Sequence, residues 1–291
     1  MNRPIALAFA LLCAGVAVSS ACLAQSAEPI RFALDSEQGR AGKIQASFRQ
    51  DRNGRDHNNW STGFLPSELL GLEVSSFRGP GTRPVRFSIV REAGRLDCSG
   101  TGGEEHAHGS CRFTMDPGFA HLLAARGIGT PNERQGFSLM AVNARRDVID
   151  SIAAAHYPTP TIDNLMALAA LGVDGRYVTE LARAGYRPNS VQRLVEFKAL
   201  GITPQWIAGF AQVGYANVPG DGLVQMRALG ISPEFITGYQ RIGYRDLPIS
   251  TLVQLKALNI TPDFVRRAVP AGSPLPTVSR LEELRMFGER H

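Results

Sequence analysis

The chain has 291 residues, of which 44% are hydrophobic and 20% charged, and its formal net charge is +5. This composition is normal for a globular protein, and the length suits about two domains. It excludes the class of proteins that are too polar to form a hydrophobic core. The mild positive charge permits an anionic partner without requiring one.

Residues 1–24 have the pattern of a secretory signal peptide. Arg3 supplies the positive start, and the apolar run that follows ends at Val18, which is too short to cross a bilayer. We therefore predict that the protein is periplasmic or secreted. A lipid anchor at Cys22 is the less favoured alternative, and we predict no membrane-spanning segment elsewhere in the sequence.

Residues 25–115 are predicted to form a β-rich domain. Apolar and polar residues alternate from Ile44 to Phe48 and from Val85 to Ile89. This period of two is typical of antiparallel strands with one buried face. Roughly five to seven strands fit in this length. The polar residues 50–59 between two such runs are predicted to form a loop.

Two cysteines remain after removal of the predicted signal peptide. Cys98 and Cys111 fall on the apolar faces of two consecutive predicted strands, so a hairpin would bring both sulfurs to the same side. In an oxidising compartment this even pair predicts a disulfide. Two reduced, buried cysteines are the alternative.

The tip of that hairpin contains the one compact set of candidate metal ligands. Glu104, His106 and His108 combine carboxylate and imidazole groups, which suit zinc or copper. The spacing is generic, and a solvated loop is the simpler interpretation. We expect no cofactor and identify no catalytic residue, because the sequence contains no Gly-x-Ser-x-Gly elbow and no His-Glu-x-x-His motif.

Residues 116–291 are predicted to form a helical repeat domain, because one pattern recurs in them every 29 residues. A fixed period of this length is the signature of a repeat architecture. The clearest columns are Gly172, Gly201, Gly230 and Asn259; Gly185, Gly214 and Gly243; Tyr186, Tyr215 and Tyr244; and Tyr177, Trp206, Phe235 and Phe264.

Each repeat unit is predicted to contain two short helices. Gly201 stands where the first helix ends in left-handed backbone, and Thr203 and Pro204 supply the cap and first turn of the second. Gly214 ends the second helix. Helices this short are marginal alone, so neighbouring units must stack to bury their apolar sides, as in an α-solenoid.

One column of the first helix is basic. We call it the basic column, and its members are Lys198, Arg227, Lys256 and Arg285. Neighbouring helices pack roughly 10 Å apart, so four cations could line one ridge that binds an anionic ligand. The alternative is an ordinary solvated helix face.

Several segments together resemble a known family. They are WSTGFLPSELLGL at 60–72, FSIVREAGRL at 87–96, FTMDP at 113–117 and the following Ala-Leu-Gly-Ile and Gly-Tyr repeats. The arrangement resembles the extracytoplasmic C-terminal region of bacterial antibiotic-sensor-like membrane zinc peptidases and its stand-alone secreted relatives. The likeness spans most of the mature chain, but its motifs are caps and turns. It implies a sensing or interaction module, and because the peptidase module is absent the family's zinc chemistry is not carried over.

We therefore predict an α+β protein, with an N-terminal antiparallel β domain followed by an α-solenoid of 29-residue two-helix repeats. Its expected function is non-catalytic binding, scaffolding or sensing of a protein or an anionic cell-envelope polymer. The alternative is an envelope enzyme with an unrecognised site in the β domain or between the domains. A deep polar cavity with converging ionisable groups would favour the enzyme.

We expect no nucleic-acid partner. Helix-hairpin-helix DNA-binding modules have similar turns and present successive backbone N–H groups to phosphate. Here Pro204, Pro233 and Pro262 remove one such donor in three units. The predicted signal peptide also argues against DNA binding.

Overall fold

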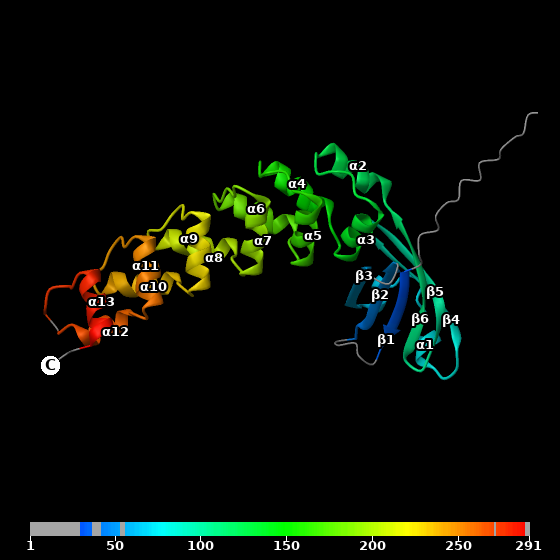
Figure 1. Cartoon of the computed structure of the whole chain (residues 1–291), viewed down its shortest axis with the longest axis horizontal. Helices are drawn as coiled ribbons and strands as arrows, with labels where there is room; N and C mark the ends of the chain where they lie inside the picture. Colours follow the sequence, from blue (N-terminus) through cyan, green and yellow to red (C-terminus); the bar gives the residue numbers. More distant parts are fainter. Residues whose placement is uncertain (1–29, 37–41, 53–55, 271, 289–291) are drawn as a thin grey trace, which may run out of the picture.

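A computed structural model of the chain describes residues 30–36, 42–52, 56–270 and 272–288. The predicted signal peptide and Cys22 lie outside the described residues. In the described part, six strands come first and a long series of helices follows (Figure 1). This confirms the predicted α+β arrangement.

The strands form one antiparallel sheet in the order β3-β2-β1-β6-β5-β4. A single turn of helix, α1, and a short 3₁₀ segment, η1, lie between β3 and β4. The bounds are β1 (Ile30–Asp35), β2 (Ile44–Arg52), β3 (Asp56–Phe64), η1 (Pro66–Glu68), α1 (Ser75–Arg78), β4 (Arg83–Arg91), β5 (Gly94–Gly103) and β6 (His106–Met115).

The loop predicted at residues 50–59 is wrong in its extent. β2 continues to Arg52 and β3 begins at Asp56, and these two residues are paired in the ladder. Polar composition suggested a loop, but β3 is an edge strand and its backbone ladder does not require apolar side chains. The prediction from polar composition therefore made this hairpin too short.

The sheet is strongly curved, with one buried face. The rings of Phe32 on β1 and Phe87 on β4 lie 5.0 Å apart, although β6 and β5 separate their strands in the sheet. Gly100 and Gly109 are directly paired between β5 and β6. A Cβ at Gly100 would lie 2.0 Å from the carbonyl oxygen of His108, so only glycine permits this close approach.

The helices form an elongated row that leads away from the sheet, with the C-terminus at the far end (Figure 1). Contacts connect alternate helices: α3–α5–α7–α9–α11–α13 on one side, and α4–α6–α8 and α10–α12 on the other. The bounds are α2 (Pro117–Ala125), α3 (Glu133–Ala141), α4 (Arg146–Ala154), α5 (Ile162–Ala170), α6 (Gly175–Arg183), α7 (Val191–Ala199), α8 (Pro204–Gln212), α9 (Gly220–Ala228), α10 (Pro233–Arg241), α11 (Ile249–Ala257), α12 (Pro262–Ala268) and α13 (Val278–Phe287).

The predicted helix caps are confirmed. The hydroxyl of Thr203 accepts a hydrogen bond from the backbone N–H of Trp206 at 3.1 Å, and Pro204 occupies the first turn. Gly201 and Gly214 have φ values of 66° and 93°, in the left-handed region that favours glycine. The sequence signals for where each helix begins and ends were therefore sufficient here.

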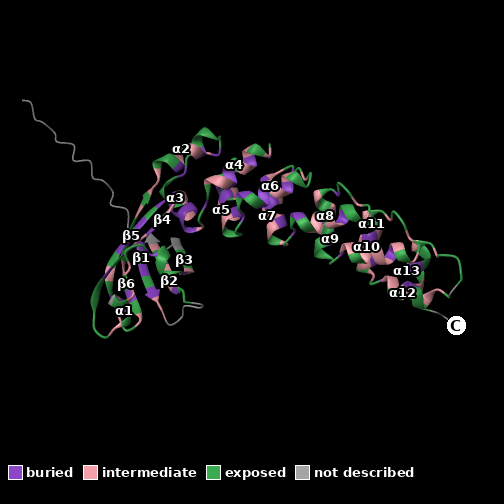
Figure 2. Cartoon of the chain, turned by 180° about the vertical axis from the view of Figure 1, so that it is seen from behind, coloured by how far each residue is buried: buried purple, intermediate pink, exposed green. Residues whose placement is uncertain are grey.

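The sheet and the first helices share one hydrophobic core. Phe137 of α3 contacts Trp60 and Phe113 of the sheet, with ring centroids 6.3 and 5.7 Å away. Arg91 of β4 donates hydrogen bonds to the carbonyl oxygens of Met140 and Ala141 at the end of α3. Buried residues continue from the strands into the helical row (Figure 2). The core thus crosses the predicted domain boundary at residue 115.

None of the helices formed by the described residues has both the length and the apolar content needed to cross a bilayer.

Candidate functional site

Each side chain of the basic column lies over an aromatic ring. The distances from the cationic group to the ring centroid are 4.8 Å for Lys198 over Tyr177, 5.6 Å for Arg227 over Trp206, 4.9 Å for Lys256 over Phe235 and 5.4 Å for Arg285 over Phe264. All four are within the range of cation–π attraction. We call these four pairs the cation–aromatic ladder.

The two arginines of the ladder make a second contact. The Nε of Arg227 donates to the carbonyl oxygen of Leu200 at 2.8 Å, and that of Arg285 donates to Leu258 at 3.1 Å. Leu200 and Leu258 are the C-cap residues of α7 and α11, where helix carbonyls lack intrahelical partners. These cations therefore also connect one repeat unit to the next.

The positive charge of the ladder is not neutralised by the described residues. None of its four cations forms an ion pair with a described Asp or Glu, whereas Arg193 on α7 pairs with both Glu196 and Asp221. The lysines and arginines of the ladder are half-buried or exposed. The arrangement presents fixed positive charge along the helical row, which is suited to an anionic ligand.

The sequence showed both columns of the ladder but not their association. Every cation follows its aromatic partner by the same number of residues, as Lys198 follows Tyr177 and Arg227 follows Trp206. That constant offset follows from the shared 29-residue period and holds for any two columns, so it does not identify the pairing. The structure adds that each cation stacks on a ring, and the binding of an anionic ligand along this column stays a prediction.

The candidate metal ligands lie at the β5–β6 hairpin. Glu104 is in the turn with a φ of 54°, while His106 and His108 project from one face of β6. His106 Nδ1 lies 3.6 Å from a carboxylate oxygen of Asp35 on the paired strand β1. The described residues contain no group of three His, Cys, Asp or Glu placed to hold a metal ion. Metal binding here stays a prediction.

A cavity of about 490 Å³ lies on the solvent side of the sheet and includes Asp35, His106, His108 and Ser61 in its lining. The Ser61 hydroxyl donates to the carbonyl oxygen of Ala46 and accepts from Gln45. A nucleophile activated by histidine would require a hydrogen bond between the two. The described residues form no such bond at this cavity.

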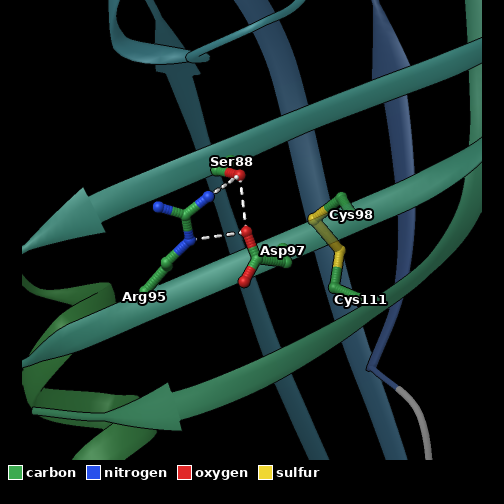
Figure 3. The surroundings of a disulfide bond; sticks show 5 residues. All are labelled: Ser88, Arg95, Asp97, Cys98 and Cys111. Carbon is green, nitrogen blue, oxygen red and sulfur yellow. Dashed lines mark hydrogen bonds and ion pairs between the residues drawn. A yellow bond between two sulfur atoms is a disulfide. The ribbon is translucent and has the colours of Figure 1, made fainter.

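Cys98 and Cys111 are a directly opposed pair on β5 and β6, with their sulfurs at a bonding distance of 2.07 Å (Figure 3). This confirms the predicted pairing. Asp97 projects to the opposite face, where it accepts hydrogen bonds from Ser88 and Arg95, both at 2.6 Å. The bond from Ser88, together with Arg95, lowers the pKa of the Asp97 carboxyl below its ordinary value.

Comparison of the chain with protein-family models, with curated proteins and with solved structures finds no match.

Proposed function

We propose that the protein is an exported binding module that recognises an anionic partner along the cation–aromatic ladder. The partner is an acidic protein surface or an anionic polymer of the cell envelope. The resemblance to extracytoplasmic sensor regions is consistent with this role and stays an expectation. An envelope enzyme remains the alternative.

The observation that carries this proposal is the row of four cations that have no carboxylate partner among the described residues. Stacking on a ring holds each cation in place before a ligand arrives, which lowers the entropy lost on binding. The alkyl stem of each side chain covers the ring while the charged end stays at the surface. A ligand with several anionic groups could contact more than one unit at once and gain from multivalency.

Export is supported by two features. The N-terminal sequence has the signal-peptide pattern, and the cysteine pair at bonding distance is typical of proteins from oxidising compartments. Both features are compatible with a partner in the envelope or outside the cell.

The test compares how strongly the mature protein and a four-Met variant are retained on poly-L-glutamate. The variant carries methionine in place of all four cations: Lys198→Met, Arg227→Met, Lys256→Met and Arg285→Met. Methionine keeps an apolar stem over each ring and removes the charge. We expect retention to weaken by about tenfold or more in this variant. We also expect binding of the parent to fall as salt rises and the Debye length drops below about 10 Å.

The matched control removes the same charge from exposed arginines of the same helical row, with Arg183→Met, Arg241→Met, Arg245→Met and Arg267→Met. Equal loss in both variants would show that only net charge matters and would overturn the proposal. Because the column variant also loses two carbonyl hydrogen bonds, its circular dichroism must match that of the parent. The single Lys198→Met variant loses no hydrogen bond, so its retention on poly-L-glutamate shows the effect of removing the charge alone.

A further inference from the structure

A cavity of about 360 Å³ opens between the end of α6, the helix α8 and the turn before α9. We call it the tyrosine cavity. Its lining includes Tyr186, Tyr215, Ala208, Ala211 and Gly220. Its volume is within the range of about 300–1,000 Å³ that is usual for small-molecule sites. It is separate from the cation–aromatic ladder, none of whose members lines it.

The cavity coincides with small residues at positions where neighbouring units have larger ones, most clearly Gly220 and Ala208. Gly220 stands in a column whose other members in the neighbouring units are Ile162, Val191, Ile249 and Val278. Ala208 corresponds to Thr179 one unit earlier and to Thr237 one unit later, whereas Ala211 corresponds to Ala182 in the earlier unit and to Gln240 in the later one. There Gln240 reaches across and donates to the carbonyl oxygen of Val213 at 2.9 Å.

Tyr186 is the exception within its own column. The hydroxyls of the other tyrosines donate to backbone carbonyl oxygens: Tyr157 to Tyr186 at 2.8 Å, Tyr215 to Leu247 at 2.7 Å and Tyr244 to Pro276 at 2.6 Å. The hydroxyl of Tyr186 forms no hydrogen bond with any residue that the structure describes. The position with an unused hydroxyl is thus also the position with the cavity.

The Tyr186 hydroxyl is held in place by its surroundings. Its ring packs on Phe197, with centroids 4.6 Å apart. A Cβ at Gly220 would lie 2.8 Å from the hydroxyl oxygen, so glycine is needed for this orientation. Burial raises the pKa of Tyr186 to about 12. The hydroxyl is therefore protonated at neutral pH and able both to donate and to accept a hydrogen bond.

We infer that the tyrosine cavity binds a small molecule with a flat apolar body and one hydroxyl group. The rings of Tyr186 and Tyr215 and the side chains of Ile207 and Val218 supply apolar walls for the body. The Tyr186 hydroxyl is the partner for the ligand's hydroxyl. Arg187 and Asn217 also line the cavity, so its apolar walls are accompanied by a few polar groups, which is the usual composition of such sites.

The experiment is a fluorine NMR titration of the mature protein with 4-fluorophenol, and with fluorobenzene as the probe that lacks the hydroxyl. We expect saturable binding of 4-fluorophenol and weaker binding of fluorobenzene. Tyr186→Phe should weaken 4-fluorophenol by about fivefold, the effect of one net hydrogen bond, and leave fluorobenzene unchanged. Ala208→Thr with Ala211→Gln, copied from the next unit, should abolish binding of both probes.

The matched control is Ala228→Thr with Ala257→Gln, which makes the same substitutions at exposed sites on α9 and α11 and should bind like the parent. Two results would overturn the inference. One is binding of 4-fluorophenol that does not saturate, and the other is unchanged binding in a folded variant with Ala208→Thr and Ala211→Gln. If that variant fails to fold, Tyr186→Phe and the shifts of the Ala208 and Ala211 methyl groups in the parent decide the question. The four-Met variant of the basic column should still bind 4-fluorophenol, so this result is independent of the proposed function.

Discussion

Single residues with left-handed backbone define where the helices end. Two columns of residues, each repeating at the 29-residue period, have positive φ throughout the described helical row. They are Asn143, Gly172, Gly201, Gly230, Asn259 and Gly288, and Gly127, His156, Gly185, Gly214, Gly243 and Gly272. Most are glycine because other residues are strained in this conformation. Asn143 and Asn259 replace glycine in the first column, because asparagine is the usual substitute for glycine at this position.

Gly214→Val should destabilise the protein through backbone strain alone. Gly214 has a φ of 93°, and a Cβ there would meet no atom within 4 Å. A β-branched residue in this conformation costs about 1–3 kcal/mol. The control is Gln212→Val, an exposed change at the end of α8 that should cost about 0.5 kcal/mol or less. Urea denaturation measures both, and equal midpoints would show that the strain argument is wrong.

The partly buried tyrosines should make the fold sensitive to alkaline pH. Burial raises the pKa of Tyr186 from 10.0 to about 12 and raises those of Tyr215 and Tyr244. Because the pKa is higher in the folded state, this stabilisation is complete below pH 10 and is lost as pH rises toward 12. Denaturation of the parent and of Tyr186→Phe over this window tests the effect. The slope with pH should be shallower in the variant, and identical slopes would contradict the assignment.

At the scale of elements, the sequence predicted helices and their ends better than it predicted contacts between them. Thr203, Pro204 and Gly214 act locally, so their sequence signals were sufficient. The stacking of Arg227 on Trp206 depends on how one unit lies against the next, which no local pattern encodes. The tyrosine cavity is similar, because it arises where Gly220 departs from its column and only packing shows whether the space is filled.

The disulfide should be the strongest single stabiliser of the β5–β6 hairpin. Cys98 and Cys111 are 13 residues apart in sequence, and closing a loop of that size contributes on the order of 3 kcal/mol in the chain-entropy model. The unreduced mature chain should show the mass loss of two hydrogens. Replacing both cysteines by alanine should lower the free energy of unfolding by about 2–4 kcal/mol.

The control for that variant is Ser99→Ala with Ser110→Ala, the adjacent opposed pair on the same two strands. Both serines are exposed, so the change should stay within about 0.5 kcal/mol. Two free thiols in correctly exported protein, or equal stability of the cysteine and serine variants, would refute the role assigned to the bond.

At the scale of the whole molecule, the two-part arrangement was predictable, but the particular residues that join its two parts were not. Period-two and 29-residue patterns identified the sheet and the helices separately. The sequence does not single out Arg91, yet its guanidinium lies over Trp60 and Phe64 and donates hydrogen bonds to the end of α3. Long-range contacts of this kind depend on the tertiary fold and leave no periodic signal in the sequence.

The last prediction is a gradient of stability along the molecule. At one end, the sheet and α2–α5 share an extensive core, and at the other end α13 contacts α11 and leaves Met286 and Phe287 60% and 62% exposed. Amide protection should therefore be high in β5, β6 and α3 and low in α12 and α13, as measured by hydrogen exchange with mass spectrometry.

In a row of helices held by contacts between near neighbours, a local defect should also stay local. Arg91→Met removes the bonds to Met140 and Ala141, so it should lower protection in the sheet and α3 and leave α11–α13 unchanged. Arg86→Met, exposed on the same strand, is the control and should change neither. Equal protection at both ends, or loss of protection in α11–α13 of Arg91→Met, would show instead that the sheet and the helical row unfold as one cooperative unit.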